Sequence, residues 1–220
     1  MAPIAYIGVA VVSYLLGSIP TGFLVAKGRG IDIRTVGSGN IGATNVFRHL
    51  GKPAGVFVLL VDALKGWVAV VGLVRLATLW LYPSADAESR EWLAIIAGIS
   101  AILGHNYTCW LHFKGGKGIA TSAGVLTALV PKALLIIFVV WGIVFALSRY
   151  VSLASMAAAF ALPFAVWATH GSPRLVIVTA AMSALAIYKH KANIRRLLNG
   201  TENRIGGKKP PPTGAAVSAP

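Results

Sequence analysis

Acidic side chains are scarce in this 220-residue sequence. It contains six Asp and Glu residues against 20 Lys and Arg residues, and its formal net charge is +14. So few carboxylates offer no acidic cluster for magnesium. A single cysteine, Cys109, excludes an intramolecular disulfide and a cysteine metal cage, and we interpret it as a small buried side chain. We therefore expect no metal and no cofactor.

Several catalytic signatures are also missing. The sequence has no His-Glu-x-x-His zinc pair and no Gly-x-Ser-x-Gly nucleophile elbow. The Gly116-Lys117 pair does not belong to a Walker A loop, because that pattern requires glycine at position 111, where the residue is Leu111. These absences disfavour metal-dependent and triad mechanisms.

Apolar residues, in contrast, are abundant along nearly the whole chain. They make up 56% of the sequence, charged residues make up 12%, and the mean hydropathy is +0.74. Soluble domains are about half apolar and about a quarter charged. The excess predicts helices that cross a lipid bilayer, each of about 20 residues. The apolar runs cover about residues 4–25, 54–81, 92–111, 119–147, 151–169 and 175–188. The first run has no basic segment before it, so we interpret it as a retained span and not a signal peptide.

The distribution of cations decides how many spans there are. If residues 119–147 form two short spans that turn at Pro131, the loops after spans one, three, five and seven share one face. Those loops hold Lys27, Arg29, Arg34, Arg48, Lys52, Lys114, Lys117, Arg149, Lys189, Lys191, Arg195, Arg196, Arg204, Lys208 and Lys209. A single span there would send the last basic segment to the other face. Because cytoplasmic loops are enriched in Lys and Arg, we predict seven spans, an N-terminus outside and a cytoplasmic C-terminus.

The expected architecture is therefore an all-α polytopic membrane protein with seven transmembrane helices over residues 1–205. Residues 206–220 are rich in proline and small residues, and we predict a disordered tail there. The cations lie between membrane spans and not on a soluble face with interleaved aromatics, which disfavours nucleic acid as a partner.

A first polar block, GSGNIGATN, covers residues 37–45 and is followed by Arg48. Glycines permit backbone geometries in which successive N–H groups converge on an anion, and an arginine fork suits phosphate. The alternative is a flexible turn that opens a helix. We favour an anion site, with these candidate residues: Gly37, Ser38, Gly39, Asn40, Thr44, Asn45 and Arg48.

A second block comprises GHN at residues 104–106 and FKGGKGIATS at residues 113–122. A glycine-rich loop with two lysines leads here into the start of a helix, the end that favours negative charge. The candidate residues of this loop are Gly115, Gly116, Lys117 and Gly118. His105 is either part of the site or an ordinary polar residue at the membrane interface.

A third block, HKANIRRLLNGTEN, covers residues 190–203. On a helix, His190 and Asn193 are three residues apart and can act on one object. A basic amphipathic segment resting on anionic lipid is the alternative, and it explains the lysines and arginines but not His190, Asn193 or Glu202.

Two further pairs of polar residues lie in predicted spans. Asp62 and Lys65 are three residues apart on one helix face, and we expect an intrahelical ion pair in preference to a direct catalytic role. Ser152 and Ser155, at the start of the sixth span, either face the site or bond backbone carbonyls.

In order and spacing, the three blocks resemble the signature motifs of the bacterial membrane acyl-phosphate:glycerol-3-phosphate acyltransferases, and the similarity extends from about Tyr14 to Arg204. One departure is Thr108-Cys109, where that family commonly has a proline after the His-Asn-aromatic stretch. The resemblance implies a seven-span enzyme of the bacterial inner membrane that uses acyl phosphate and glycerol 3-phosphate on its cytoplasmic face. It also implies a second enzyme that produces the acyl phosphate.

The resemblance further implies the roles of individual residues. A clamp on glycerol phosphate would comprise Ser38, Arg48, Lys117, His190 and Asn193. Residues that bind or frame the substrates would be Gly37, Gly39, Asn40, Thr44, Asn45, His105, Gly115, Gly116, Gly118, Ser152, Ser155 and Glu202. The proton of the attacking hydroxyl would go to His190 or to a substrate phosphate. No histidine in the sequence begins the His-x4-Asp pair of many other glycerolipid acyltransferases.

Two other classes of protein are compatible with the composition. A small transporter of phosphorylated metabolites would need a cationic site, but carriers normally show repeat symmetry and a site at mid-membrane. A non-catalytic membrane protein that binds anionic lipid would leave the first block unexplained.

Overall fold

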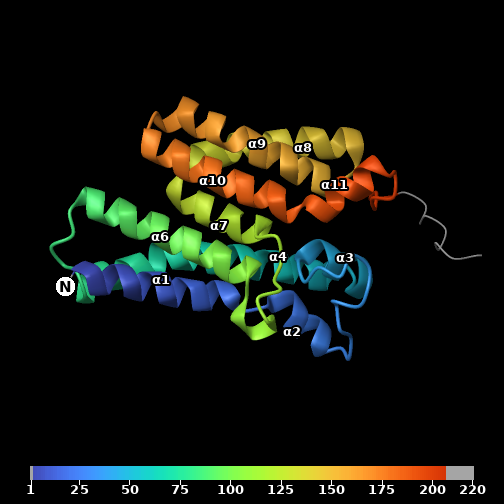
Figure 1. Cartoon of the computed structure of the whole chain (residues 1–220), viewed down its shortest axis with the longest axis horizontal. Coiled ribbons are helices and arrows are strands. Elements are labelled where there is room, and N and C mark those ends of the chain that lie inside the picture. The colour runs from blue at the N-terminus through green and yellow to red at the C-terminus, as the bar shows by residue number, and fades with distance from the viewer. Residues whose placement is uncertain (1, 207–220) are drawn as a thin grey trace, which may run out of the picture.

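The computed structural model describes residues 2–206, and every regular element in that range is a helix (Figure 1). Apart from Gly206, the tail predicted over residues 206–220 lies outside the described residues. The elements are α1 (Ala2–Ser18), α2 (Thr21–Lys27), α3 (Ala43–Leu50), α4 (Lys52–Trp67), η1 (Val68–Leu73), α5 (Val74–Trp80), α6 (Ala87–Asn106), η2 (Cys109–Leu111), α7 (Ile119–Leu129), α8 (Pro131–Ser148), α9 (Val151–His170), α10 (Pro173–Lys189) and α11 (Lys191–Leu198).

Five helical stretches among the described residues are long and apolar enough to cross a membrane. They are Ala2–Lys27, Lys52–Trp80, Ala87–Leu111, Pro131–Ser148 and Val151–His170. A sixth is reached if α10 and α11, which meet at 55°, are counted as one bent span. The prediction of an all-helical membrane protein is therefore confirmed. With 11 residues, α7 is only about 16 Å long and is shorter than a bilayer core.

Two prolines mark breaks that the sequence predicted. The first apolar run is divided at Pro20, since α1 ends at Ser18 and α2 begins at Thr21. The stretch over residues 119–147 is divided at Pro131, where α8 begins directly after α7. Proline favours the first turn of a helix and disfavours a helical residue before it, which explains both boundaries. In Figure 1, α7 runs away from the end of the bundle that carries α11, and α8 runs back toward it.

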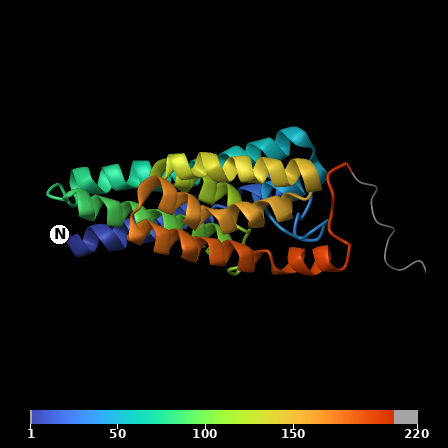
Figure 2. The same cartoon turned by 90° about the horizontal axis from the view of Figure 1, so that it is seen from above.

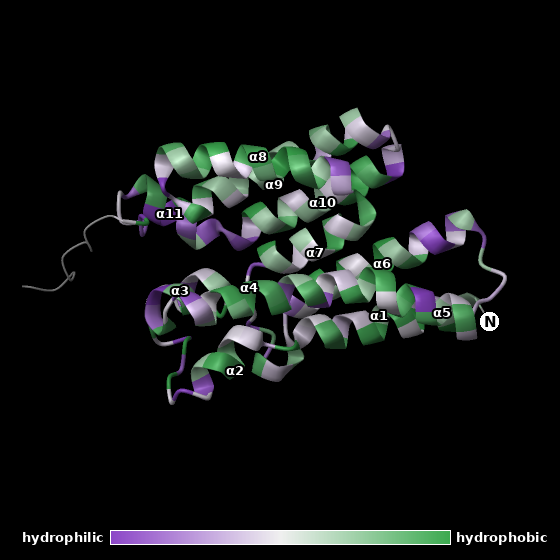
Figure 3. Ribbon diagram, turned by 180° about the vertical axis from the view of Figure 1, so that it is seen from behind, coloured by the Kyte–Doolittle hydropathy of each residue, from purple (hydrophilic) through white to green (hydrophobic). Residues whose placement is uncertain are grey.

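The bundle has two polar ends and an apolar middle. Figures 1 and 2 show the N-terminus at one end and α2, α3 and α11 at the opposite end. Hydrophilic residues gather at the end with α3 and α11, while apolar residues cover the long helices (Figure 3). On α8, Leu135, Phe138 and Leu147 face outward. Apolar side chains on the outside of a membrane bundle are in contact with lipid.

Close backbone contact fixes α7 against α4. A Cβ atom at Gly124 would collide with the Ala63 carbonyl oxygen, and a Cβ at Gly66 would collide with the Thr121 carbonyl oxygen. Small residues let membrane helices approach in this way. Since α7 begins directly after the glycine-rich loop of the second block, this contact also holds that loop in place.

Gly124→Ala is expected to destabilise the protein. The added methyl group has no room against α4, and overpacking of this kind costs about 1–3 kcal/mol. The measurement is the thermal unfolding midpoint of the purified protein in detergent. Gly142→Ala on α8 is the matched control, because a Cβ there meets no atom within 4 Å. Equal midpoints for the two variants would contradict the assignment of this contact.

Candidate functional site

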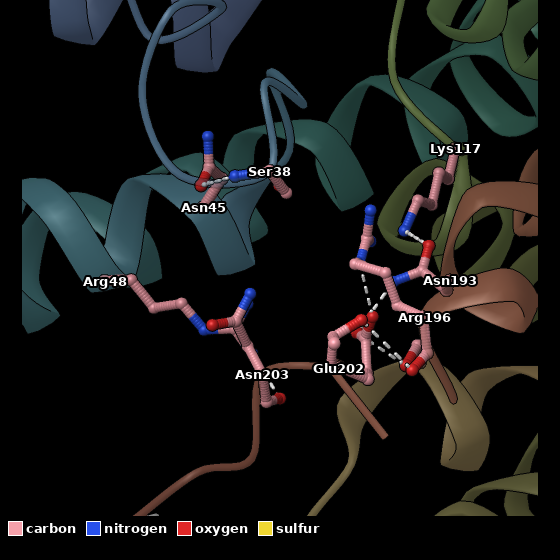
Figure 4. Close-up of polar contacts among 10 residues, drawn as sticks. Ser38, Asn45, Arg48, Lys117, Asn193, Arg196, Glu202 and Asn203 are labelled. Carbon is pink, nitrogen blue, oxygen red and sulfur yellow. Dashed lines mark hydrogen bonds and ion pairs between the residues drawn. The ribbon is translucent and has the colours of Figure 1, made fainter. Parts of the chain in front are cut away.

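Residues from the three sequence blocks meet at the end of the bundle opposite the N-terminus. Lys117, from the loop before α7, donates a hydrogen bond to the side-chain oxygen of Asn193 on α11 (Figure 4). Arg48 on α3 donates to the backbone carbonyl of Asn203, at 3.2 Å. These two contacts link the second block to the third and the first block to the third.

The carboxylate of Glu202 organises the third block. Its Oε1 atom accepts hydrogen bonds from Asn193 Nδ2 at 2.8 Å and from Ser152 Oγ at 2.9 Å. Its Oε2 atom accepts from Arg196 Nε at 2.7 Å (Figure 4). Glu202 thereby fixes the Asn193 amide, which receives the hydrogen bond from Lys117 on its other atom. A chain of charge-assisted hydrogen bonds holds both side chains in one geometry.

Lys117 is a cation of reduced basicity. Burial of its ammonium lowers its pKa most, Glu202 opposes this effect, and the positive charges of Arg196 and Arg48 lower the pKa further, to about 8. The ammonium is therefore mostly charged at neutral pH. Its three donors suit a compact anion such as a phosphate group.

His190 lies at the junction between α10 and α11. Its Nδ1 atom is 2.8 Å from the Ala186 carbonyl oxygen, which can only accept a hydrogen bond. Nδ1 therefore carries the proton of the neutral ring, and Nε2 is the acceptor atom. The backbone carbonyl of His190 also accepts from the N–H of Asn193 at 2.8 Å, so the two residues share one turn.

In the first block, Asn45 is a scaffold of the loop. Its Oδ1 atom accepts from the N–H of Ser38 at 3.2 Å, and its Nδ2 atom donates to the backbone carbonyls of Ile33, Val36 and Asn40. The Asn45 side chain is buried, whereas Ser38, Thr44 and Arg48 are partly exposed around it. Gly37 and Gly39 have positive φ angles of 59° and 66°, which the loop needs in order to turn around this amide.

The glycines of the second block lie on the end of α6. The N–H of Gly115 donates to the Asn106 carbonyl, and the N–H of Gly116 donates to the His105 carbonyl, at 3.2 and 3.0 Å. These two N–H groups are therefore already used. Gly118, with φ of 79°, is the N-cap residue of α7, and the first turn of that helix presents N–H groups without intrahelical partners. The backbone donors for an anion are consequently those after Gly116.

A cavity of about 250 Å³ opens beside these donors. It is lined by Asn40, Tyr107, Gly115, Gly116, Lys117, Tyr188, Lys189, Lys191 and Ala192. Lys189 Nζ lies 4.4 Å from the centre of the Tyr107 ring and donates to the Asn106 carbonyl at 2.9 Å. The cavity therefore combines cations, amides and aromatic side chains, which are suitable partners for an anionic head group.

Four of the seventeen predicted site residues line this cavity: Asn40, Gly115, Gly116 and Lys117. Ser155 and His105 are two of those that lie outside it and have other partners. Ser155 accepts a hydrogen bond from the Trp141 indole at 3.2 Å, so it joins α8 to α9. His105 lies beneath the loop of the second block and not in the cavity. Its imidazole packs on Gly116, and its Nδ1 atom is 3.7 Å from Asp62 Oδ1. The expected Asp62–Lys65 ion pair is present, at 2.8 Å.

Sequence reasoning missed several residues of this region. The sequence places Arg196 among the cytoplasmic cations and in the third block but predicts no role for it in the site, whereas in the structure it binds Glu202. The predicted site also lacks four residues that line the cavity: Tyr107, Tyr188, Lys189 and Lys191. The available signal was the run Tyr188-Lys189-His190-Lys191 at the junction of α10 and α11, which places one tyrosine and two lysines around His190. Among residues 2–206, no group of three or more His, Cys, Asp or Glu side chains is placed to hold a metal ion.

These features define a helical integral membrane protein with a cation-rich polar site at one end of its bundle. The chain belongs to the glycerol-3-phosphate acyltransferase family, since the sequence model of the family with that description matches residues 7–200. The resemblance inferred from the three blocks is thereby confirmed.

Individual relatives and solved structures agree with this assignment. A protein named glycerol-3-phosphate acyltransferase from Geobacter metallireducens is 50% identical over 193 residues, which are 88% of this chain and 94% of that protein. One of the same name from Geotalea daltonii is 46% identical over 191 residues, which are 87% and 93% of the two chains. The fold is similar to the glycerol 3-phosphate form of PlsY (YgiH), described as an integral membrane glycerol 3-phosphate acyltransferase. That structure has a TM-score of 0.79 and 39% identity, and the match covers 90% of this chain and 94% of that chain.

Proposed function

We propose that this enzyme transfers an acyl group from acyl phosphate to the sn-1 hydroxyl of glycerol 3-phosphate. The products are 1-acyl-glycerol 3-phosphate and inorganic phosphate. The observation that carries the proposal is the hydrogen-bonded set of Lys117, Asn193 and Glu202 beside Arg48, at the polar end of an apolar bundle. A charged acceptor and an amphipathic donor can meet there without leaving the membrane surface.

In the proposed reaction, the sn-1 oxygen attacks the carbonyl carbon of the mixed anhydride. The new ester bond forms, the bond between the carbonyl carbon and the phosphate oxygen breaks, and inorganic phosphate leaves. Because acyl phosphate is already activated, the protein needs no covalent intermediate, and positioning and charge stabilisation carry the rate. Ser38, Arg48, Lys117, His190 and Asn193 would hold glycerol 3-phosphate. Asn40, Thr44 and the N–H groups that follow Gly116 would hold the acyl-phosphate end.

Two groups can accept the hydroxyl proton in this scheme. One is His190, whose Nε2 atom is the acceptor of the neutral ring. The other is a substrate phosphate dianion, with a second pKa of about 6 by analogy with phosphorylated side chains. The pH–rate profile of His190→Ala separates them. Disappearance of the low-pH limb that wild type shows assigns the proton to His190, and an unchanged limb assigns it to the phosphate.

Seven crossings with the N-terminus outside complete the proposal. In this arrangement α7 is a short span paired with α8, and the polar end with α2, α3 and α11 faces the cytoplasm of a bacterial inner membrane. The excess of cations at that end supports this orientation. Residues 1–205 would form one domain. Its donor substrate would come from a separate enzyme that produces acyl phosphate.

The direct test uses purified protein in lipid vesicles. Acyl phosphate and radiolabelled glycerol 3-phosphate are supplied, and labelled lysophosphatidate and released phosphate are measured. We expect one phosphate for each lysophosphatidate, and no product when acyl-CoA replaces acyl phosphate. Absence of product with acyl phosphate, or product with acyl-CoA alone, would refute the proposed reaction.

The rate should also depend on pH through Lys117. Its pKa is lowered to about 8, so the ammonium is present below that pH and is lost above it. We expect kcat/KM for glycerol 3-phosphate to fall above pH 8, by up to about tenfold per pH unit. Lys117→Arg, whose guanidinium stays charged, should remove this alkaline limb even if its absolute rate is lower. An alkaline limb at the same pH in Lys117→Arg would show that deprotonation of Lys117 does not cause it.

A further inference from the structure

Four polar side chains form a cluster inside the bundle, which we call the buried hub: Thr21, Asp62, Lys65 and His105. Each is more than nine-tenths buried. Asp62 Oδ1 is 2.8 Å from Lys65 Nζ and accepts a hydrogen bond from Thr21 Oγ1 at 3.0 Å. The same oxygen is 3.7 Å from His105 Nδ1. Residues from α2, α4 and α6 therefore converge on one carboxylate.

The depth of the hub in the bilayer makes its charges costly. Asp62 is ten residues beyond Lys52, where α4 begins, which corresponds to about 15 Å along the helix. Ionisable residues at such a depth are rare and usually serve a function. The proposed reaction does not use Asp62 or Lys65 directly, so the presence of a buried ion pair here needs another explanation.

One branch of the hub leads to the second block. His105 lies between Asp62 on one side and Gly116 on the other. A Cβ atom at Gly116 would collide with the imidazole, and the N–H of Gly116 donates to the His105 carbonyl at 3.0 Å. The orientation of the ring therefore sets how closely the loop can lie on α6. The next residue in that loop is Lys117.

The other branch leads to the first block. Lys65 Nζ donates to the Ile19 carbonyl at 3.0 Å, which lies in the break between α1 and α2, and Thr21 at the start of α2 donates to Asp62. The hub thus closes the break at Pro20, and α2 is the helix that precedes the loop at residues 37–45 in the chain. Both polar loops begin from elements that are fixed to the same carboxylate.

We propose that Asp62 and Lys65 are positioning residues that act through His105 and Gly116 to place the ammonium of Lys117 against the substrate phosphate. The inference rests on the proposed acyl transfer, in which Lys117 contacts glycerol 3-phosphate. Displacement of a reacting or binding group by about 1 Å costs up to about 100-fold in rate, so a small shift of this loop has a measurable effect.

The test is a double-mutant cycle between the hub and Lys117. Asp62→Asn/Lys65→Met removes both charges together, because removal of one would leave the other unpaired in the membrane. In wild-type background we expect kcat/KM for glycerol 3-phosphate to fall by about tenfold, mainly through KM. In a Lys117→Gln background, the same double substitution should lower kcat/KM by less than about twofold, because the ammonium that the hub positions is gone. Equal losses in both backgrounds, or no loss in wild type, would overturn the proposal.

One control variant and one substitute variant separate positioning from general destabilisation. Arg174→Gln breaks the ion pairs of Arg174 with Glu88 and Glu91 at the far end of the bundle, and it should lower the unfolding midpoint without changing kcat/KM. If the charge-free pair does not yield folded protein, Thr21→Val takes its place in the cycle, with an expected loss of about threefold for one hydrogen bond. If Arg174→Gln lowers kcat/KM as much as the hub variant does, the fall in kcat/KM comes from general destabilisation and not from the position of the loop.

A readout without turnover distinguishes failure of the hub from failure of the proposed reaction. Amide hydrogen exchange at Gly115 and Gly116 reports whether their bonds to the end of α6 open more often. We expect at least fivefold faster exchange in the hub variant than in wild type. Unchanged exchange overturns the positioning role even if the wild-type enzyme is inactive. Faster exchange with an inactive wild type refutes only the acyl transfer.

Discussion

Lys117→Met is expected to lower kcat/KM for glycerol 3-phosphate by about 10²–10³-fold, the effect of removing one preorganised donor to a developing or bound negative charge. Lys117 is the cation that the glycine-rich loop carries into the site, and its ammonium donates to Asn193. Methionine keeps most of the apolar stem and removes the charge. The measurement is steady-state acyl transfer in vesicles, with acyl phosphate saturating and glycerol 3-phosphate varied.

Lys114→Met in the same loop is the matched control for this variant. Lys114 is exposed and does not line the cavity. An exposed lysine adds to the general attraction of anions but holds no defined geometry, so we expect a change of less than about threefold. Equal losses in Lys114→Met and Lys117→Met would mean that net charge, and not the position of Lys117, supports catalysis.

Much of the fold was predictable because its determinants are local. Apolar runs and the prolines at positions 20 and 131 predicted the helices and their breaks, and the uneven cations predicted that the polar loops would lie together. The short α7 also agrees with the first of the two short spans predicted for residues 119–147, but its packing partner could not be predicted. Its 11 residues are held by the contact of Gly124 with α4, and this contact depends on how two distant helices approach each other.

The side-chain partners within the site were less predictable for the same physical reason. Asn45 was expected to face a substrate, but its amide matches three backbone carbonyls of its own loop. Ser155 lies on the face of α9 that meets Trp141, and only the packing of α8 reveals this. A sequence motif shows which hydrogen-bond donors are present. Whether a donor binds substrate or backbone depends on distances that the whole bundle sets.

Glu202→Gln is expected to lower kcat/KM by about 100-fold, although Glu202 is itself an anion in a site for anions. Burial on its own would raise the Glu202 pKa, but hydrogen bonds from Arg196, Asn193 and Ser152 outweigh it, and the pKa is lowered. The carboxylate accepts all three donors. An amide at this position has one accepting atom, so it would turn an N–H₂ group toward at least one of these donors. An N–H₂ group that faces Asn193 Nδ2 would displace the Asn193 amide, whose oxygen would then no longer be held toward Lys117, and one that faces Arg196 Nε would release the guanidinium.

The pH dependence of this loss distinguishes a framework carboxylate from a proton donor. A carboxyl group whose folded-state pKa is lowered contributes fully above its ordinary pKa, and the contribution is lost only as the pH falls through the lowered value. The ratio of wild-type to Glu202→Gln activity should therefore stay constant between about pH 5 and 6.5. At higher pH the ratio should rise, because loss of the Glu202 charge lowers the Lys117 pKa further. Glu91→Gln, which weakens a carboxylate–arginine pair at the opposite end of the bundle, should leave the activity unchanged. If the ratio rises or falls by about tenfold between about pH 5 and 6.5, Glu202 takes part in proton transfer, and its role as the acceptor that orients Asn193 is insufficient.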